Sequence, residues 1–137
     1  MPRVHLLSVR TGMRYSGPLF DHRARRAFRD FQEDLEEEAA EFVLDNIKDT
    51  FHTHFKRPTG YYESNVRITN VSGSPEVWDG GMAGPRYGPW LEGVGSRNNT
   101  TRFKGYHAFR KAAQDLDARI EGMGDRIFRL RYRNRLE

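Results

Sequence analysis

The chain has 137 residues and a mass of 16.0 kDa, which suits one domain and is too short for two cores of ordinary size. It contains no cysteine, which excludes disulfides, thiolate metal sites and a cysteine nucleophile. The formal charge of +4 and the pI near 9.6 point to an anionic partner as one possibility to test. No apolar run reaches the roughly 18 residues that span a bilayer, and the first residues lack a signal-peptide pattern, so we expect a soluble protein made in a cytoplasm without a membrane partner.

The first predicted element is a short strand over residues 4–9, which are apolar and partly β-branched and are followed by Thr11 and Gly12. The next is a long helix. From Phe20 to Phe55 apolar residues recur at steps of three and four, Pro18 suits a first helical position, and Pro58 ends the pattern. We therefore predict a helix over residues 18–56, longer than a globule of this size covers along one face.

After this helix, residues 64–71 alternate as a half-buried strand does, and Ser72 to Pro75 turn the chain into a second strand ending at Trp78. The sequence thus predicts a hairpin within residues 62–78. Residues 79–97 follow as a loop and interface region, because Asp79 to Pro85 are rich in glycine and have no regular pattern.

A C-terminal helical region is predicted over residues 105–134, beginning near Gly105 and interrupted at Gly122 and Gly124. Beyond these glycines the pattern fits both a helix and an edge strand, and we favour the helix. The predicted fold is a single α+β domain over residues 1–137, in which a long N-terminal helix packs on a small antiparallel sheet with a second, C-terminal helix beside it.

Charged residues form separate blocks. Basic residues dominate 22–29 and 126–135, whereas acidic residues dominate 30–49. Such blocks suit complementarity between chains better than a single nucleic-acid footprint, although each acid taken alone also fits a solvated face.

The pattern of residues predicts no catalytic, metal or cofactor site. His52 and His54 are two residues apart on a predicted helix and so face different ways, which is a poor spacing for metal ligands. His107 suits packing or capping at a helix start. Residues 93–98 resemble an anion nest only in outline, because the lysine of a phosphate loop is missing.

Two segments have a recognisable order. Pro58-Thr59-Gly60 runs into Ser64-Asn65-Val66 after the long helix, and Tyr87-Gly88-Pro89-Trp90-Leu91-Glu92-Gly93 precedes the second helix. With the aromatic and alanine-rich helix entry at 101–112, these segments resemble the neck and tail-completion (head-tail joining) proteins of long-tailed bacteriophages, in particular of actinobacterial phages. Trp90 stands where the family pattern has a second tyrosine, and the glycine-rich stretch at 79–85 and the arginine-rich end depart from it.

The resemblance implies a non-enzymatic virion structural protein that forms a ring, a hexamer, at the head-tail junction or tail end and joins the tail to the DNA-filled head. Its implied partners are copies of itself, other neck proteins, the tail-tube protein, and genomic DNA passing non-specifically through the lumen. The implied location is the neck or tail of a virion assembled in the host cytoplasm.

We expect subunit contacts at residues that combine aromatic or rigid groups with charges, in the 87–97 region, the acidic helix and the arginine-rich end: Tyr87, Pro89, Trp90, Leu91, Glu92, Arg97, Glu33, Glu37, Glu41, Arg129 and Arg133. Residues 79–97 and the arginine-rich end are expected to gain order only on assembly, with the acidic segment 33–41 of an adjacent subunit or ring as the partner of the arginines.

Arg23 and Arg26 are candidates to face DNA. The alternative function is a basic nucleic-acid-binding protein that uses its arginine clusters on phosphates.

Overall fold

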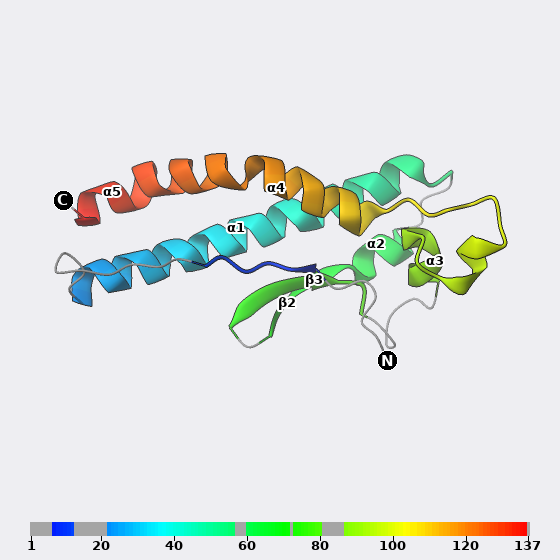
Figure 1. The fold of residues 1–137 in the computed structure, drawn as a ribbon, viewed down its shortest axis with the longest axis horizontal. Coiled ribbons are helices and arrows are strands. Elements are labelled where there is room, and N and C mark those ends of the chain that lie inside the picture. Colours follow the sequence, from blue (N-terminus) through cyan, green and yellow to red (C-terminus); the bar gives the residue numbers. More distant parts are fainter. Residues whose placement is uncertain (1–6, 13–21, 57–59, 72, 81–86, 137) are drawn as a thin grey trace.

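The computed structural model describes residues 7–12, 22–56, 60–71, 73–80 and 87–136. Expectations for residues 4–6, 18–21, 57–59, 72 and 81–85 lie outside this part of the chain. Two long helical segments run antiparallel along the molecule, and a small sheet covers the other side of the first one (Figure 1).

The first of these helices, α1 (His22–His54), has 33 residues and is therefore roughly 50 Å long. One stripe of its side chains is buried, including Ala39, Val43, Ile47 and Phe51, whose steps of four match the predicted period. The predicted helix is confirmed over 22–54, while Phe55 and Lys56 follow its last turn.

The sheet contains three antiparallel strands in the order β1-β3-β2. β1 (Leu7–Ser8) pairs with β3 (Ser74–Trp78) on one edge, and β2 (Arg67–Val71) pairs with β3 on the other. Val77 lies opposite both Leu7 and Ile68 and is fully buried beneath α1. The predicted α+β architecture, with the long helix on a small antiparallel sheet, is confirmed.

The start of the predicted strand at 64–71 is wrong. Ser64 and Asn65 belong to a short helix, α2 (Tyr61–Asn65), which begins after Gly60 at a φ of 78°. The Ser64 N–H donates to the Gly60 carbonyl at 2.9 Å, and the Asn65 side chain donates to Tyr61 O at 2.7 Å. This turn directs Tyr62 into the core before the strand begins, a local hydrogen-bonding choice that the alternating pattern conceals.

The C-terminal helix starts later and continues further than predicted. α4 (Ala108–Ile127) leads through a π-helical turn, η3 (Phe128–Tyr132), into α5 (Arg133–Leu136), so the edge-strand alternative is wrong. Gly122 and Gly124 do not interrupt it. A Cβ at Gly124 would only be in ordinary contact with Leu35 and Phe31 at 3.7 Å, and Gly122 has open space around it. Ile120, Met123 and Ile127 next to the glycines pack in the cluster with α1, and this packing outweighs the helix cost of about 1 kcal/mol per glycine.

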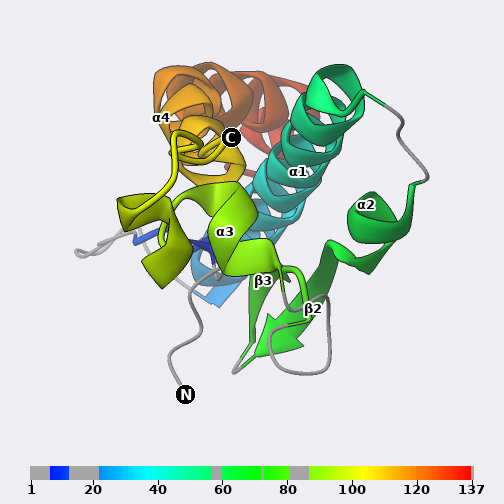
Figure 2. The same ribbon diagram turned by 90° about the vertical axis from the view of Figure 1, so that its right-hand side faces the viewer.

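Residues 87–99 also form regular structure within the single chain. α3 (Gly88–Glu92) and η2 (Ser96–Asn99) cover the end of the molecule next to α2 (Figure 2). The expectation that 79–97 and the arginine-rich end order only on assembly is therefore wrong for 87–97 and for 126–136, because contacts within one chain build both.

Candidate interaction surfaces

The segment 87–93 is built around a buried carboxylate. Asp79 is 1% exposed and accepts a hydrogen bond of 3.0 Å from the hydroxyl of Tyr62. Gly88 lies directly against it, since a Cβ there would be 2.2 Å from Asp79 Oδ2. Burial, followed by the neighbouring Asp79 charge, raises the pKa of Tyr62. The glycine is thus required by the close approach of the backbone to this pair.

Glu92 joins this segment to the second long helix. It is buried, and its two carboxylate oxygens accept the backbone N–H groups of Phe109 (3.1 Å) and Arg110 (3.2 Å) in the first turn of α4. The first N–H groups of a helix have no partners within it. A carboxylate accepts their hydrogen bonds, and its negative charge interacts favourably with the helix dipole. Glu92 therefore caps α4 from a distant part of the chain.

Two glycines and an asparagine complete the junction. Gly93 and Gly105 have positive φ values and lie so close that a Cβ on Gly105 would be 2.3 Å from Gly93 N. Asn98 is buried, donates to Trp90 O (3.0 Å) and Phe103 O (3.2 Å), and accepts from Gly95 N–H (2.9 Å). Sequence reasoning missed Asn98, whose side chain fixes the loop.

The anion-nest outline at 93–98 has a structural explanation. The N–H groups of Gly93, Val94 and Gly95 all donate to the carbonyl of Pro89, at 3.0 to 3.1 Å. These donors are used within the turn, so they do not point together at a phosphate. His107 is the residue before α4 with a φ of 53°, and its ring packs against Gly93, which agrees with the expected packing role.

Aromatic rings connect this end of the molecule. Phe51 packs edge-on against Tyr62 and Tyr106 with centroid distances of 4.7 and 6.0 Å, and the Trp90 ring lies 4.5 Å from Phe103. The Trp90 indole N–H is buried and has no acceptor within the described part of the chain.

The six residues of this region that we predicted to form subunit contacts differ in solvent exposure. Leu91 and Glu92 are buried in the chain's own fold, which already accounts for both side chains, so subunit contacts are not needed to explain them. Tyr87 and Arg97 are exposed and Pro89 and Trp90 are half-buried, so their role in subunit contacts stays a prediction.

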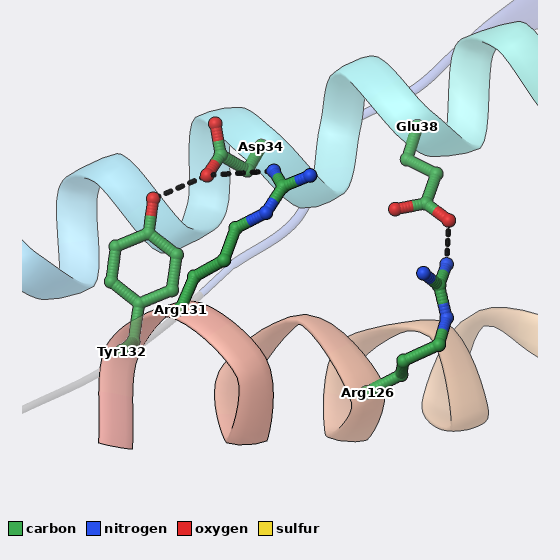
Figure 3. A network of polar contacts seen from close by, with 5 residues as sticks. All are labelled: Asp34, Glu38, Arg126, Arg131 and Tyr132. Carbon is green, nitrogen blue, oxygen red and sulfur yellow. Dashed lines mark hydrogen bonds and ion pairs between the residues drawn. The ribbon is translucent and has the colours of Figure 1, made fainter. Parts of the chain in front are cut away.

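The other end of the molecule is a helical arm, formed by residues 22–38 of α1 and residues 123–136 opposite them. Acidic side chains of α1 meet arginines and a tyrosine of the C-terminal segment (Figure 3). Asp34 accepts from the Tyr132 hydroxyl and lies 3.4 Å from Arg131, Glu38 pairs with Arg126, and Asp30 is 3.0 Å from Arg135.

These pairs correct the expected location of the charge complementarity. Acidic side chains of the same chain pair with arginines of the arginine-rich end. Burial, followed by the hydrogen bond to Asp34, raises the pKa of Tyr132 to about 12. Glu36 is also not on a solvated face. It is buried and accepts from the backbone N–H of Thr11 at 2.8 Å.

One stripe of acids remains exposed. Glu33, Glu37 and Glu41 repeat every four residues on α1 and are all solvent-exposed. They border a groove of about 510 Å³ between α1 and the β2–β3 hairpin, which we call the acidic trough. Its lining consists of these acids and of residues from α1 and the hairpin: Glu33, Glu36, Glu37, Ala40, Glu41, Ile68, Asn70, Gly73 and Pro75.

Basic side chains gather at the tip of the arm. Arg23 and Arg26, the predicted DNA-facing residues, are exposed in the first turns of α1, beside the end of α5. Within the described part of the chain, Arg26 and its neighbours Arg25 and Arg29 have no acidic partner. On the C-terminal segment, Arg129 pairs with Asp125 at 3.2 Å. The C-terminal end of the second basic cluster, in α5, thus lies near the first basic cluster, while its earlier arginines lie opposite acids of α1.

The histidines of α1 make separate local contacts. His52 Nδ1 is 3.7 Å from Glu63, and His54 Nδ1 is 2.7 Å from the carbonyl of Thr50. Among the described residues, no three His, Asp or Glu side chains gather as metal ligands would. None of the described helices combines the length and apolar character that crossing a bilayer requires.

Comparison with known proteins adds no relative: no family model, curated protein or solved structure matches the chain.

Proposed function

We propose that this protein is a non-enzymatic virion structural protein that forms a ring, a hexamer, at the head-tail junction or tail end of a long-tailed phage. In this role it joins the tail to the DNA-filled head, contacting copies of itself, other neck proteins and the tail-tube protein. Genomic DNA passes through the lumen with at most non-specific contacts.

The observation that carries the proposal is the exposed negative charge on α1 that the ion pairs within the folded chain do not use. Internal pairs use Asp30, Asp34 and Glu38, yet the exposed stripe of Glu33, Glu37 and Glu41 remains beside them. Like charges four residues apart on a helix repel one another, so this spacing of acids lowers the stability of the helix itself. A cyclic assembly repeats one contact between two different surfaces, which an acidic face and a cationic face on the same chain supply.

The segment that resembles the phage neck proteins supports the proposed function in a second way. Residues 87–98 lie at the end of the molecule where α4 begins, with Glu92 capping that helix and Asn98 fixing the loop. This geometry explains why Tyr, Gly and Glu follow one another in the segment 87–93, and the explanation needs no catalytic role.

Purified virions test the proposal. Peptides of this protein should be present in mass spectra of gradient-purified particles, and antibodies against it should label the head-tail joint in electron micrographs. The major capsid and tail-tube proteins serve as internal standards for copy number. Virions free of the protein would contradict the proposed function.

Nucleic-acid binding is a second candidate, favoured by the exposed arginines in the first turns of α1, which contacts α5 at the arm tip. Binding of duplex DNA measured against salt separates the two. Sequence-selective binding that persists near about 0.15 M salt would favour a dedicated nucleic-acid-binding protein. Weak, steeply salt-dependent binding that Arg25→Ala and Arg26→Ala reduce would fit a basic surface beside a DNA conduit.

A further inference from the structure

We propose that copies of this chain dock through two specific surfaces: the outer face of the C-terminal helix of one copy, centred on Leu130, enters the acidic trough of the next. The inference rests on the proposed function, because it names the contact through which a ring would form.

The trough has the shape and chemistry of a helix-binding groove. Ala40, Ile68 and Pro75 line it with apolar groups, and Glu33, Glu37 and Glu41 border it with carboxylates. Its volume of about 510 Å³ accommodates several side chains. An occupant must therefore be cationic and carry an apolar group, and the carboxylates repel nucleic acid.

The C-terminal helix presents such a face. Leu130 is 73% exposed, and four exposed arginines lie within four residues of it along the chain: Arg126, Arg129, Arg131 and Arg133. Arg126 and Arg131 pair with Glu38 and Asp34 of α1, so Arg129 and Arg133 are the arginines that the docking uses. A single exposed leucine is ordinary on a protein surface. Combined with guanidinium groups, which bind carboxylates in a fixed, two-pronged geometry, this leucine matches both features of the trough.

The two surfaces cannot meet within one chain. Ile127 and Tyr132 of the same helix are buried against α1 together with Ala27 and Leu35, so Leu130 projects away from α1. The trough opens toward the sheet, although Glu37 and Glu41 on its border also line the hollow between α1 and the C-terminal segment, where Arg126 and Arg131 lie. Contact between them is therefore heterologous, with each copy giving one surface and receiving the other, as a ring or a filament requires.

Engineered disulfides test this contact directly, since the chain has no cysteine of its own. The variant Leu130→Cys/Glu37→Cys, oxidised at low ionic strength, should form a ladder of covalent multimers. A matched control, Leu130→Cys/Val94→Cys, keeps the first cysteine and moves the second to an exposed residue near α3. It should give only the collisional dimers seen with Leu130→Cys alone.

Charge reversal identifies the groups responsible. Adding Glu33→Lys and Glu41→Lys to the double-cysteine variant should reduce the ladder at least tenfold, and further addition of Arg129→Glu and Arg133→Glu should restore much of it. Circular dichroism checks that each variant keeps the helical fold. A yield of covalent multimers no higher than that of the control, or one that the charge reversals leave unchanged, overturns the inference.

The same cysteines in assembled particles separate this inference from the proposed function. Virions that contain the protein but yield no disulfide between residues 130 and 37 overturn the docking and leave the function standing. A disulfide from residue 37 to a different virion protein likewise overturns it, because another basic segment then occupies the trough. Particles without the protein overturn the function itself.

Discussion

The two ends of the molecule are held together by different interactions. At the α3 end, aromatic rings pack around Phe51, and the buried carboxylates of Asp79 and Glu92 have fixed hydrogen-bond donors. At the arm end, a small cluster of Ala27, Leu35, Ile127 and Tyr132 is supplemented by surface ion pairs. The first end is thus held by buried packing and hydrogen bonds, whereas the second is held in part by exposed ion pairs, which salt screens.

Removing the central ring of the scaffold should have the largest effect. Phe51 is 0% exposed, so Phe51→Ala leaves a cavity and should lower the free energy of unfolding by about 3–5 kcal/mol. Urea titration followed by circular dichroism measures the loss. Phe55→Ala, at a half-buried ring on the same helix end, is the matched control and should lose less. Equal losses would mean that packing is not concentrated at Phe51.

Removing the carboxylate that caps α4 should have the second-largest effect on stability. Glu92→Ala leaves two helix N–H groups without an acceptor and should lower the free energy of unfolding by about 2 kcal/mol. Glu92→Gln keeps one acceptor and should lose less. Hydrogen exchange at Phe109 and Arg110 should accelerate in the alanine variant, and unchanged exchange there would refute the capping role.

In the arm, Tyr132→Phe should have a smaller effect, about 1 kcal/mol, because Asp34 is partly exposed and water replaces the lost donor. Its signature is the dependence on pH. The pKa of Tyr132 is raised to about 12 in the folded state, against about 10 in an unfolded chain. The hydroxyl is protonated below both values, so its contribution is complete below pH 10 and is lost as the pH rises toward 12.

Unfolding curves at a series of alkaline pH values measure this loss. The Tyr132→Phe variant should lose less stability than wild type between pH 10 and 12, while Tyr62, whose pKa is also raised, still contributes in both proteins. Parallel curves for the two proteins over this range would show that the hydrogen bond to Asp34 contributes nothing.

The exposed acidic stripe should give the smallest effect, with the opposite sign. Glu37→Gln removes repulsion from Glu33 and Glu41 and should raise the free energy of unfolding by about 0.2–0.5 kcal/mol. The same change should weaken assembly if the trough binds a neighbour. Asp117→Gln, on the exposed face of α4, controls for charge removal alone. A variant that is less stable than wild type would contradict this explanation of the stripe.

The sequence predicted the long-range architecture because periodicity reports burial. The stripe that includes Val43, Ile47 and Phe51 follows the helix period, and the alternation from Val66 through Ile68 follows the strand period. Both patterns are set by a single buried face, so they are visible without knowing what covers that face.

The missed features depend on contacts between distant segments. Glycine propensity indicated a break at Gly124, but the packing of Met123 and Ile127 against α1 keeps the helix continuous. The acidic and basic blocks were visible in the sequence, yet only the antiparallel helices show that Asp30, Asp34 and Glu38 meet arginines of the same chain. The capping role of Glu92 gave no local signal, because its partners Phe109 and Arg110 lie in another segment. Asn98 bonds to nearby residues of an irregular loop, which has no periodic pattern to indicate its role.

The most direct test of the proposed function is electron microscopy of lysates in which the phage is produced without this protein. The proposal predicts DNA-filled heads and complete tails that remain unjoined, with joining restored when wild-type protein is supplied and not when the Glu33→Lys/Glu41→Lys variant is supplied. Joined, infectious particles assembled in its absence would contradict the proposal.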